Sequence, residues 1–334
     1  MDRPFHRRDF LKSAAGFGAG IGLAGSAPGA APGMFVSLHS SLVGGKVAWP
    51  EFARLAARVG YGGADLNLAG AMKEGLEATR GLLAELKLRV GFTGLPVTAT
   101  RDESTFKSGM VGLEAAAKFA SGVGCNRMAV VVPAASATPK AELRKTLKDR
   151  FTEVAKVLAG QNVRMGFEFL GPLQFRLKPL TEFIWRMNEM LEFAKECGPN
   201  VGLTLDAWHW HHAGATAADI LAAGKPRIVT VHVSDSAKMA PEAVRDNQRL
   251  MPGEGVIHLV EFFRALKQIG YEDGVSPEPL GRIPPETPAE ESARLGLDTT
   301  LAVMRKAGAI ALAAAWVPSR RAARVDPIEA LRQE

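Results

Sequence analysis

The stretch VGLTLDAWHWHHAG, residues 201–214, decides the fold that we predict for this chain. It begins with a short apolar run, 201–205, and stops abruptly at Asp206, with His209 three residues further on. An apolar run that ends at a carboxylate, just before a glycine-bounded loop, is typical of a buried parallel strand. We therefore interpret the stretch as a strand that delivers reactive side chains to the edge of a sheet.

Similar strand-like runs alternate with helix-like segments from Met34 onward. The other expected strands are 34–38, 64–68, 88–95, 127–132, 163–169, 228–233 and 274–277. The expected helices are 49–59, 73–86, 106–122, 140–158, 181–196, 217–223, 256–269 and 288–306. Eight strand–helix units at intervals of about 30 residues predict a single-domain α/β fold, a (β/α)8 TIM barrel. An open doubly wound sheet is the alternative, but its polar strand ends would cluster at one switch point.

Polar side chains end four consecutive predicted strands: Glu168, Asp206, His232 and Glu278. In a barrel these ends are neighbours on one rim. Taken singly, each residue has an ordinary interpretation as a helix cap, an ion-pair partner or a core histidine. Taken together, three carboxylates and one imidazole suit one divalent metal ion, Mn²⁺, Mg²⁺ or Co²⁺, with Zn²⁺ possible. Because three such carboxylates would repel one another, we also expect a positive group among them.

Composition and charge indicate an ordinary globular protein. The chain has 334 residues, 47% of them hydrophobic, with a formal net charge of +6. Much of the excess positive charge lies near the two ends of the chain, so it is weak evidence for a nucleic-acid partner, and we expect none. The two cysteines, Cys125 and Cys197, are far apart in sequence, and we expect no disulfide between them.

The N-terminus carries a targeting pattern. Residues 6–12, HRRDFLK, match the twin-arginine motif, and a stretch rich in Gly and Ala follows to about residue 31. That stretch is too short and too rich in glycine for a stable membrane span, but it suits a signal peptide. We therefore predict a twin-arginine signal peptide over 1–32, a partnership with the twin-arginine export machinery, and a periplasmic protein. The alternative is that the two arginines occur by chance before a disordered leader rich in Gly and Ala.

A C-terminal tail over 309–334 does not belong to the predicted barrel. Its apolar run is far shorter than the ~20 residues that a membrane span needs. Its basic, Asp-Pro-containing end resembles the extreme C-terminus of permease subunits of the macrolide-exporter type. We expect a poorly ordered appendage without a role in catalysis, and an ordinary surface helix is the alternative.

Four segments resemble the xylose isomerase-like TIM-barrel superfamily, which holds hydroxypyruvate isomerase, tagatose/psicose 3-epimerases, inosose dehydratase and endonuclease IV. They are GFEFLGP from Gly166, the stretch 201–214, VHVSD from Val231, and PGEGVIHLVEFFRALKQIGYEDGVSPEPLG from Pro252. The resemblance implies a barrel over 33–308 in which the four strand-end residues bind one metal ion. It also implies that His209 and a basic residue near Lys238 contact the substrate.

The resemblance and the residue types imply a proton-transfer reaction on a sugar. A sugar with a carbonyl beside a hydroxyl can chelate the metal, which stabilises the enediolate formed when the neighbouring C–H is lost. Glu168 and Glu278 would then act as general base and acid on opposite sides of that carbon. We expect a metal-dependent isomerase or epimerase of a keto-sugar or related polyol. The alternatives are a lyase or dehydratase of a keto-sugar or keto-glycoside, and a non-catalytic exported sugar-binding protein.

Several positions depart from the family pattern or stay open. The predicted third and fourth strands end without His, and Gln248 stands where endonuclease IV has a ligand His, so we do not expect a three-metal nuclease. Asp65 stands where many members have Glu. Trp208 is expected to line the sugar site or to fill the barrel rim, and Lys238 to anchor substrate or to be a surface lysine. A homo-oligomer is possible.

Overall fold

The computed structural model describes residues 33–44 and 47–310, which fall within one compact unit. The predicted signal peptide, 1–32, lies outside the described residues, and so does the predicted tail beyond residue 310. Within the described ranges, no helix combines the length and the apolar character needed to cross a membrane.

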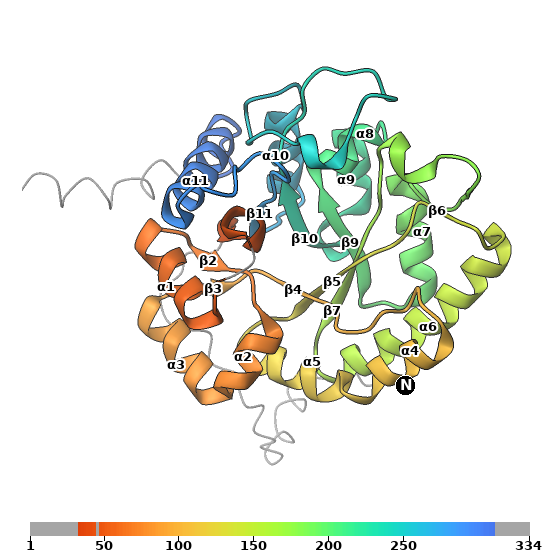
Figure 1. Cartoon of the computed structure of the whole chain (residues 1–334), viewed down its shortest axis with the longest axis horizontal. Coiled ribbons are helices and arrows are strands. Elements are labelled where there is room, and N and C mark those ends of the chain that lie inside the picture. The colour runs from red at the N-terminus through yellow and green to blue at the C-terminus, as the bar shows by residue number, and fades with distance from the viewer. Residues whose placement is uncertain (1–32, 45–46, 311–334) are drawn as a thin grey trace, which may run out of the picture. The chain divides into compact units, whose positions relative to one another are not determined.

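Nine parallel strands form one curved sheet that the helices surround (Figure 1). In chain order they are β1 (Phe35–Leu38), β2 (Gly63–Ala64), β3 (Arg89–Val90), β4 (Thr93–Gly94), β5 (Arg127–Val131), β7 (Arg164–Glu168), β9 (Val201–Asp206), β10 (Ile228–Val233) and β11 (Gly274–Pro277). Their order across the sheet is β3-β2-β1-β11-β10-β9-β7-β5-β4. A separate antiparallel pair consists of β6 (Ala135–Ser136) and β8 (Thr181–Glu182).

One interrupted strand closes the sheet into a ring. β3 and β4 lie at opposite ends of the strand order, yet only Gly91 and Phe92 separate them in the sequence. β3 pairs with β2, and β4 pairs with β5. Counting β3 and β4 as the two halves of one strand gives eight strands, so the predicted (β/α)8 barrel is confirmed.

The interruption occurs where the backbone passes close to polar side chains. A Cβ at Gly91 would lie 2.1 Å from Asp65 Oδ1 and 2.5 Å from Ser37 Oγ. Only a glycine fits there without displacing both groups. Hydrogen bonds still span the junction, because Gly91 N donates to Ala64 O at 3.1 Å and Leu66 N donates to Phe92 O at 2.8 Å.

Helices cover the outside of the ring (Figure 1). The α-helices are α1 (Trp49–Val59), α2 (Leu68–Glu74), α3 (Leu76–Leu86), α4 (Glu103–Val111), α5 (Leu113–Gly122), α6 (Lys140–Gly160), α7 (Met187–Cys197), α8 (Ala207–His212), α9 (Ala217–Ala223), α10 (Leu259–Gln268) and α11 (Ala289–Lys306). The 3-10 turns are η1 (Ser40–Val43), η2 (Leu173–Arg176), η3 (Lys225–Arg227) and η4 (Asp246–Gln248).

Two predicted helices are each divided in two. The expected helix 73–86 is replaced by α2 and α3, because Gly75 between them adopts a φ of 90°, which breaks an α-helix. The expected helix 106–122 is replaced by α4 and α5, which meet at Gly112. Both breaks occur at glycines, which lower the stability of a helix interior.

Two further predictions need correction near the strand ends. The expected helix 181–196 begins only at Met187, because residues 181–182 pair with β6 as β8. The segment after Asp206, predicted as a loop, forms α8, because the Asp206 side chain caps it by accepting from Trp208 N at 2.8 Å.

Aromatic packing fixes the strand that carries Glu168. The Phe167 ring lies 4.6 Å from Phe151 of α6 and 5.6 Å from Phe193 of α7, measured between centroids. Because successive side chains on a strand point to opposite faces, Phe167 in the helix layer directs the next side chain into the barrel. The sequence Phe-Glu at the end of β7 thus holds Glu168 at the inner rim.

Candidate metal centre

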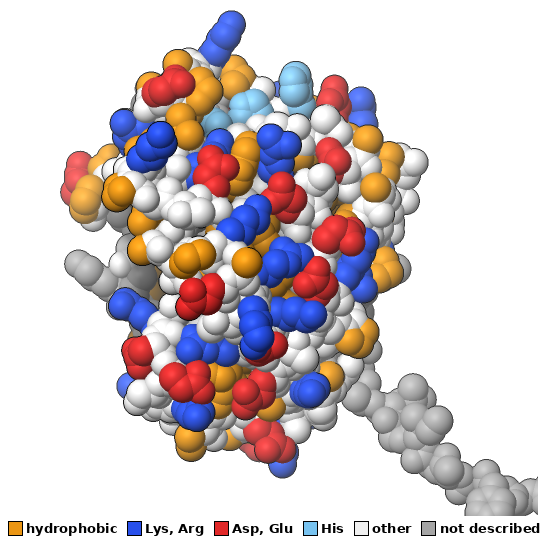
Figure 2. Space-filling view, turned by 90° about the vertical axis from the view of Figure 1, so that its right-hand side faces the viewer, with side chains coloured by type: hydrophobic (Ala, Val, Ile, Leu, Met, Phe, Trp, Pro, Cys, Tyr) orange, Lys and Arg blue, Asp and Glu red, His pale blue; other side chains and the backbone are white. Residues whose placement is uncertain are grey.

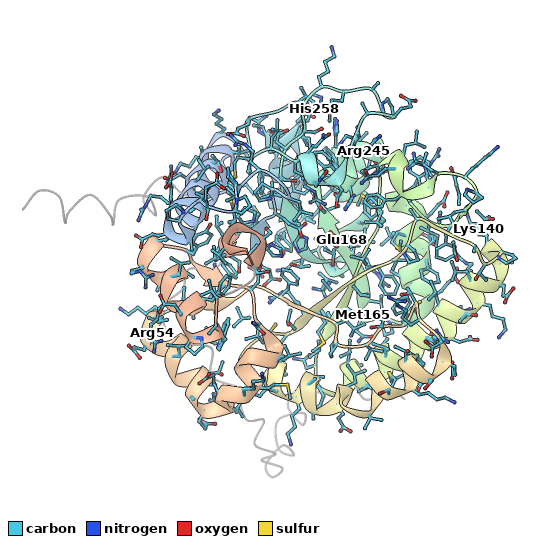
Figure 3. The ribbon with its side chains drawn as sticks, in the orientation of Figure 1. Arg54, Lys140, Met165, Glu168, Arg245 and His258 are labelled. Carbon is cyan, nitrogen blue, oxygen red and sulfur yellow. The ribbon has the colours of Figure 1, made fainter. Side chains whose placement is uncertain are left out.

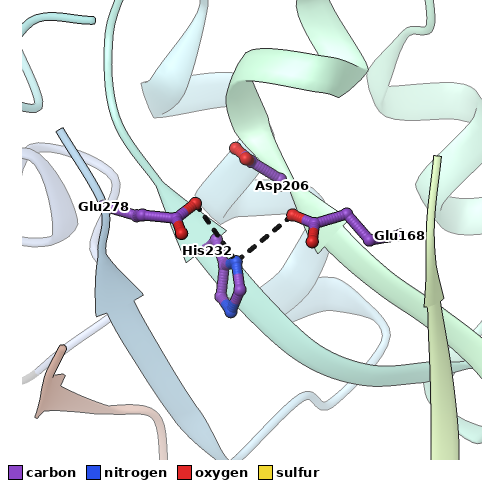
Figure 4. A group of neighbouring side chains, drawn as sticks. All are labelled: Glu168, Asp206, His232 and Glu278. Carbon is purple, nitrogen blue, oxygen red and sulfur yellow. Dashed lines mark ion pairs between the residues drawn. The ribbon is translucent and has the colours of Figure 1, made fainter. Parts of the chain in front are cut away.

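The four predicted strand-end residues meet at one rim of the barrel (Figure 4). Glu168 and Asp206 are the last residues of β7 and β9, His232 lies in β10, and Glu278 follows β11. These four strands are consecutive in the sheet, and His232 stands level with Asp206. One donor atom from each residue lies within 4.8 Å of all the others. The structure thus brings the four residues together, while their binding of a metal ion stays a prediction.

The His232 ring is aimed between two carboxylates. Its Nδ1 lies 3.4 Å from Glu168 Oε1 and 3.5 Å from Glu278 Oε2, as the dashed lines in Figure 4 show. Both ring nitrogens are buried without a hydrogen-bond partner. Buried polar atoms normally have partners. An unpartnered imidazole that faces three carboxylates fits the ligand set of a hard divalent cation.

The two glutamates occupy electrostatically different positions. Burial raises the pKa of Glu168 above its ordinary value. Burial acts on Glu278 in the same direction, but His232, His39 and Arg249 together outweigh it and lower the pKa of Glu278. For His232, burial is opposed mainly by Glu278 and Glu168, which together raise the pKa of the imidazole well above its usual range. In the protein without a metal ion, Glu278 is thus the more readily ionised of the two carboxyl groups, and Glu168 holds a proton more readily.

Arg249 supplies the positive charge that three close carboxylates require. Its side chain is only 2% exposed, and Nη1 donates to Asp206 Oδ2 at 2.8 Å and to Glu278 Oε2 at 3.0 Å. Nη2 donates to Asp246 Oδ1 at 2.7 Å. Although burial lowers it, the three carboxylates together raise the pKa of Arg249. The need for a cation could be predicted, but Arg249 itself was missed, because it lies between loop residues without a periodic pattern.

His209 and Trp208 both lie on the short helix α8, beside the cluster. His209 Nε2 is 3.7 Å from Asp206 Oδ2 and 3.3 Å from Arg249 Nη2, and burial lowers the pKa of His209 to about 4. Trp208 is fully buried, with its ring centroid 4.5 Å from that of His212. Because Trp208 is buried, the second expectation, that it fills the rim of the barrel, is favoured. Contact of Trp208 or His209 with the substrate stays a prediction.

Lys238 lies elsewhere on the rim. It is exposed, in the loop after β10, and it lines a cavity of about 730 Å³ whose lining includes none of the four predicted ligands. A role of Lys238 in anchoring the substrate stays a prediction.

A smaller cavity of about 260 Å³ adjoins the four-residue cluster on the side of β1 and β2. His39 lines it, with Nε2 3.8 Å from Glu278 Oε1, and so does Phe92, whose ring centroid is 4.8 Å from that of His232. Burial lowers the pKa of His39 to about 4, so this imidazole is neutral near pH 7.

Asp65 also lines this smaller cavity, and two serines hold its carboxyl group. Ser37 Oγ and Ser276 Oγ donate to its Oδ1 at 2.7 and 3.0 Å. Burial raises the pKa of Asp65 to about 7. His39 and Asp65 therefore give this cavity polar groups beside the four-residue cluster, which suits a polyhydroxylated ligand.

Residues 53–299 match the family described as xylose isomerase-like TIM barrel. An inosose isomerase of Halalkalibacterium halodurans is 27% identical over 168 residues, which are 50% of this chain and 57% of that relative. The chain thus spans little more than half the length of this curated relative.

Two solved structures show a similar fold. A xylose isomerase domain protein of Alicyclobacillus acidocaldarius subsp. acidocaldarius has a TM-score of 0.76 at 27% identity, with 82% of this chain and 99% of that chain covered. A structure of the IOLI protein with a zinc atom has a TM-score of 0.70 at 22% identity, with the same coverage of both chains. At that identity the second likeness shows the fold alone.

Proposed function

The chain belongs to the xylose isomerase-like TIM barrel family, and from this premise we propose that it is a metal-dependent isomerase or epimerase of a keto-sugar or related polyol. The observation that carries the proposal is the convergence of Glu168, Asp206, His232 and Glu278, with one donor atom each within 4.8 Å of the others. The resemblance to an inosose isomerase supports the same class of reaction.

Glu168, Asp206, His232 and Glu278 would hold one divalent ion. Three carboxylates and an imidazole favour Mn²⁺, Mg²⁺ or Co²⁺. Zn²⁺ is a further candidate, and the zinc atom in the structure of the IOLI protein supports including it. When bound, the ion would supply a positive charge that stabilises the negative charge developing on the sugar oxygens as the C–H bond breaks.

Glu278 and Glu168 would move the proton. In this proposal the ionised Glu278 removes the proton from the carbon beside the carbonyl, and Glu168 returns a proton to the enediolate carbon. The opposite directions of their pKa shifts support this division of roles. Positioned general bases and acids of this kind contribute roughly 10²- to 10⁴-fold each.

The sugar would extend from the metal-ligand cluster into the 260 Å³ cavity. His39 and Asp65 offer donors and acceptors there for hydroxyl groups. His209, which lies beside Asp206, would contact the substrate, with Arg249 fixing its ring by the contact at 3.3 Å. Trp208 and Lys238 stay candidates for further substrate contacts.

Exchange of substrate hydrogen with solvent tests this proposal. The full chain is incubated with Mn²⁺ in D₂O and a panel of ketoses and inososes, and the recovered sugars are examined by NMR. We expect deuterium on the carbon beside the carbonyl, together with an isomer or epimer. Loss of water or of an aglycone would instead identify a lyase, and tight binding without exchange would identify a sugar-binding protein.

Glu278→Gln is the decisive variant for the proton transfer. The amide keeps an oxygen for the metal ion but cannot accept a proton, so we expect exchange to fall by about 10²- to 10⁴-fold while Mn²⁺ still binds. Metal content and exchange rate are measured on the same preparation. Glu254→Gln, which alters a half-exposed glutamate paired with Arg282 on the surface, is the control. Full exchange by Glu278→Gln would remove Glu278 from the reaction.

A further inference from the structure

A second cavity lies on the rim, apart from the metal-ligand cluster. It has a volume of about 730 Å³ and lies among the loops that follow β7, β9 and β10. This volume is within the range of roughly 300–1,000 Å³ of small-molecule sites. In Figure 3 His258, which lines the cavity, lies at the outer edge of the fold, whereas Glu168 lies near its centre. The reaction proposed above uses none of its lining residues except the candidate Lys238.

The charges that line this rim cavity are of one sign. Its polar lining side chains are those of Arg176, Trp185, His211, His212, Lys238 and His258, and the lining includes no Asp or Glu. Figure 2 shows histidine side chains gathered at one end of the molecular face, beside hydrophobic side chains and close to Lys and Arg. A concave surface lined by cations and imidazoles attracts anions.

Arg176 and Trp185 form a fixed planar wall. The Arg176 guanidinium carbon lies 3.6 Å from the centroid of a Trp185 ring, and Nη1 donates to Gly171 O at 2.5 Å. Glu182 lies 3.6 Å from Arg176 Nε but is 56% exposed, so solvent screens this pair. A guanidinium stacked on an indole presents both a positive charge and a flat face, to which a planar ring can pack.

His211 and His212 supply hydrogen-bond donors rather than permanent charge. His212 Nε2 lies 3.3 Å from Ser236 Oγ. Burial lowers the pKa of His212 to about 4, and it also lowers that of His211, so both imidazoles are neutral near pH 7. Val244 and Val256 add apolar surface to the same cavity. The cavity thus combines two permanent cations, neutral N–H groups and apolar side chains.

We propose that this rim cavity binds a small planar organic anion, namely an aromatic ring that carries a carboxylate. The ring packs on the wall formed by Trp185 and Arg176, and the carboxylate is attracted by the charges of Arg176 and Lys238. Such an anion has two sources: a free aromatic acid, or an acidic aromatic substituent on the sugar that the neighbouring metal centre is proposed to bind. The site itself does not depend on the proposed reaction, because its lining lacks all four predicted metal ligands.

Calorimetric titration of the full chain tests the site with benzoate and with benzamide, its neutral counterpart. We expect benzoate to bind at least about tenfold more tightly than benzamide. Arg176→Gln and Lys238→Gln should each weaken benzoate binding by about tenfold or more. Arg186→Gln is the matched control, because Arg186 also lies over the Trp185 ring, at 4.7 Å, but does not line the cavity; it should change the affinity by less than about twofold.

Equal affinity for benzoate and benzamide, or no binding of benzoate, would overturn the proposal. An equal loss in Arg186→Gln would do so too. Thermal unfolding of Arg176→Gln shows whether this substitution lowers the stability of the protein. If it does, Lys238→Gln still tests the site, because Lys238 is exposed and its replacement should not affect folding.

A second titration separates the two sources of the anion. A carboxyphenyl glycoside that binds about tenfold more tightly than benzoate in the presence of Mn²⁺ would identify the anion as part of the substrate. Equal affinities would identify a free acid, and both results support the site. The same titrations on Glu278→Gln show whether the site survives when the proposed reaction is removed.

Discussion

Arg249 joins four groups that would otherwise repel one another or stay buried without a partner. It reaches Asp206, Asp246 and Glu278 with hydrogen bonds of 2.7 to 3.0 Å, and it touches the His209 ring. Removing one partner of a buried ion pair is expensive because the other charge stays out of water. At the level of single residues, Arg249 therefore holds the carboxylates in place.

Arg249→Met should lower the free energy of unfolding by about 3–5 kcal/mol in the presence of a chelator. A bound divalent ion would replace part of the missing positive charge, so Mn²⁺ should restore more stability to the variant than to the parent protein. Urea unfolding with and without Mn²⁺ measures both effects. Arg294→Met, at an exposed pair with Glu290 on α11, is the control. An equal response of both variants to Mn²⁺ would contradict this role of Arg249.

Asp65 should make stability depend on pH. Its pKa is raised to about 7 in the folded protein, above the ~3.9 of an unfolded chain. Between those values the folded state holds the extra proton, so stability is lost as pH rises from about 4 to about 7. The corresponding free energy is at most roughly 4 kcal/mol.

Asp65→Asn removes this titration while its amide oxygen can still accept from Ser37 and Ser276. We therefore expect the free energy of unfolding, measured in chelator, to fall less between pH 4.5 and 7.5 in the variant. Asp149→Asn, at an exposed position on α6, should behave like the parent. The same pH slope in Asp65→Asn and in the parent would show that Asp65 is already ionised in the folded protein.

At the level of elements, the interrupted strand β3–β4 determines whether the ring closes around Asp65. Gly91→Ala places a methyl group 2.1 Å from Asp65 Oδ1, with further contact to Ser37. We expect a loss of stability of about 1–3 kcal/mol or more from this overpacking. Gly94→Ala is the matched control, because the space around a Cβ at Gly94, in the same broken strand, is open. Thermal unfolding of the two variants compares them, and equal stability would contradict the packing argument.

The pattern of apolar runs could predict the strands and helices but not their internal breaks. α1 is predicted with its observed bounds, because its apolar residues recur on one face and Gly60 ends it in the left-handed region. By contrast, the breaks at Gly75 and Gly112 depend on backbone conformation at single glycines, to which periodicity is insensitive. α8 was missed because its cap, Asp206, was interpreted only as a ligand.

The sequence could predict those residues of the candidate site that lie at the ends of strands. Glu168, Asp206, His232 and Glu278 end consecutive strands, so the parallel topology alone brings them together. Arg249 joins them from a loop, and the position of a loop in space cannot be obtained from a strand pattern. The burial of Trp208 could not be predicted either, because the same sequence pattern is compatible with a tryptophan side chain that points into the core and with one that points toward solvent.

At the level of the whole molecule, the barrel is assembled from strands distant in sequence. β1 near the start of the described chain pairs with β11 near its end, so the ring is complete only when the entire barrel segment is present. The cysteines Cys125 and Cys197 are both buried and free, as expected. Side-chain packing and strand pairing therefore stabilise the barrel without a disulfide.

We propose that the complete protein is exported in its folded form by the twin-arginine route, on the strength of the motif at residues 6–12. Replacing Arg7 and Arg8 together by Lys should keep the protein in the cytoplasm, as cell fractionation would show. Replacing Arg320 and Arg321 in the same way, near the other end of the chain, is the control and should leave export unchanged. Periplasmic recovery of the first variant would contradict the proposal.

The contacts of Arg249 also bear on biosynthesis. The guanidinium of Arg249 and the imidazolium of His232 already offset part of the negative charge of the carboxylates before any ion arrives. Maturation can then proceed in two separate stages, first the folding of the chain and later the uptake of the ion. In the second stage an entering divalent ion would displace a proton from His232, so the proposed loading would compete with hydrogen ions and become weaker in acid surroundings.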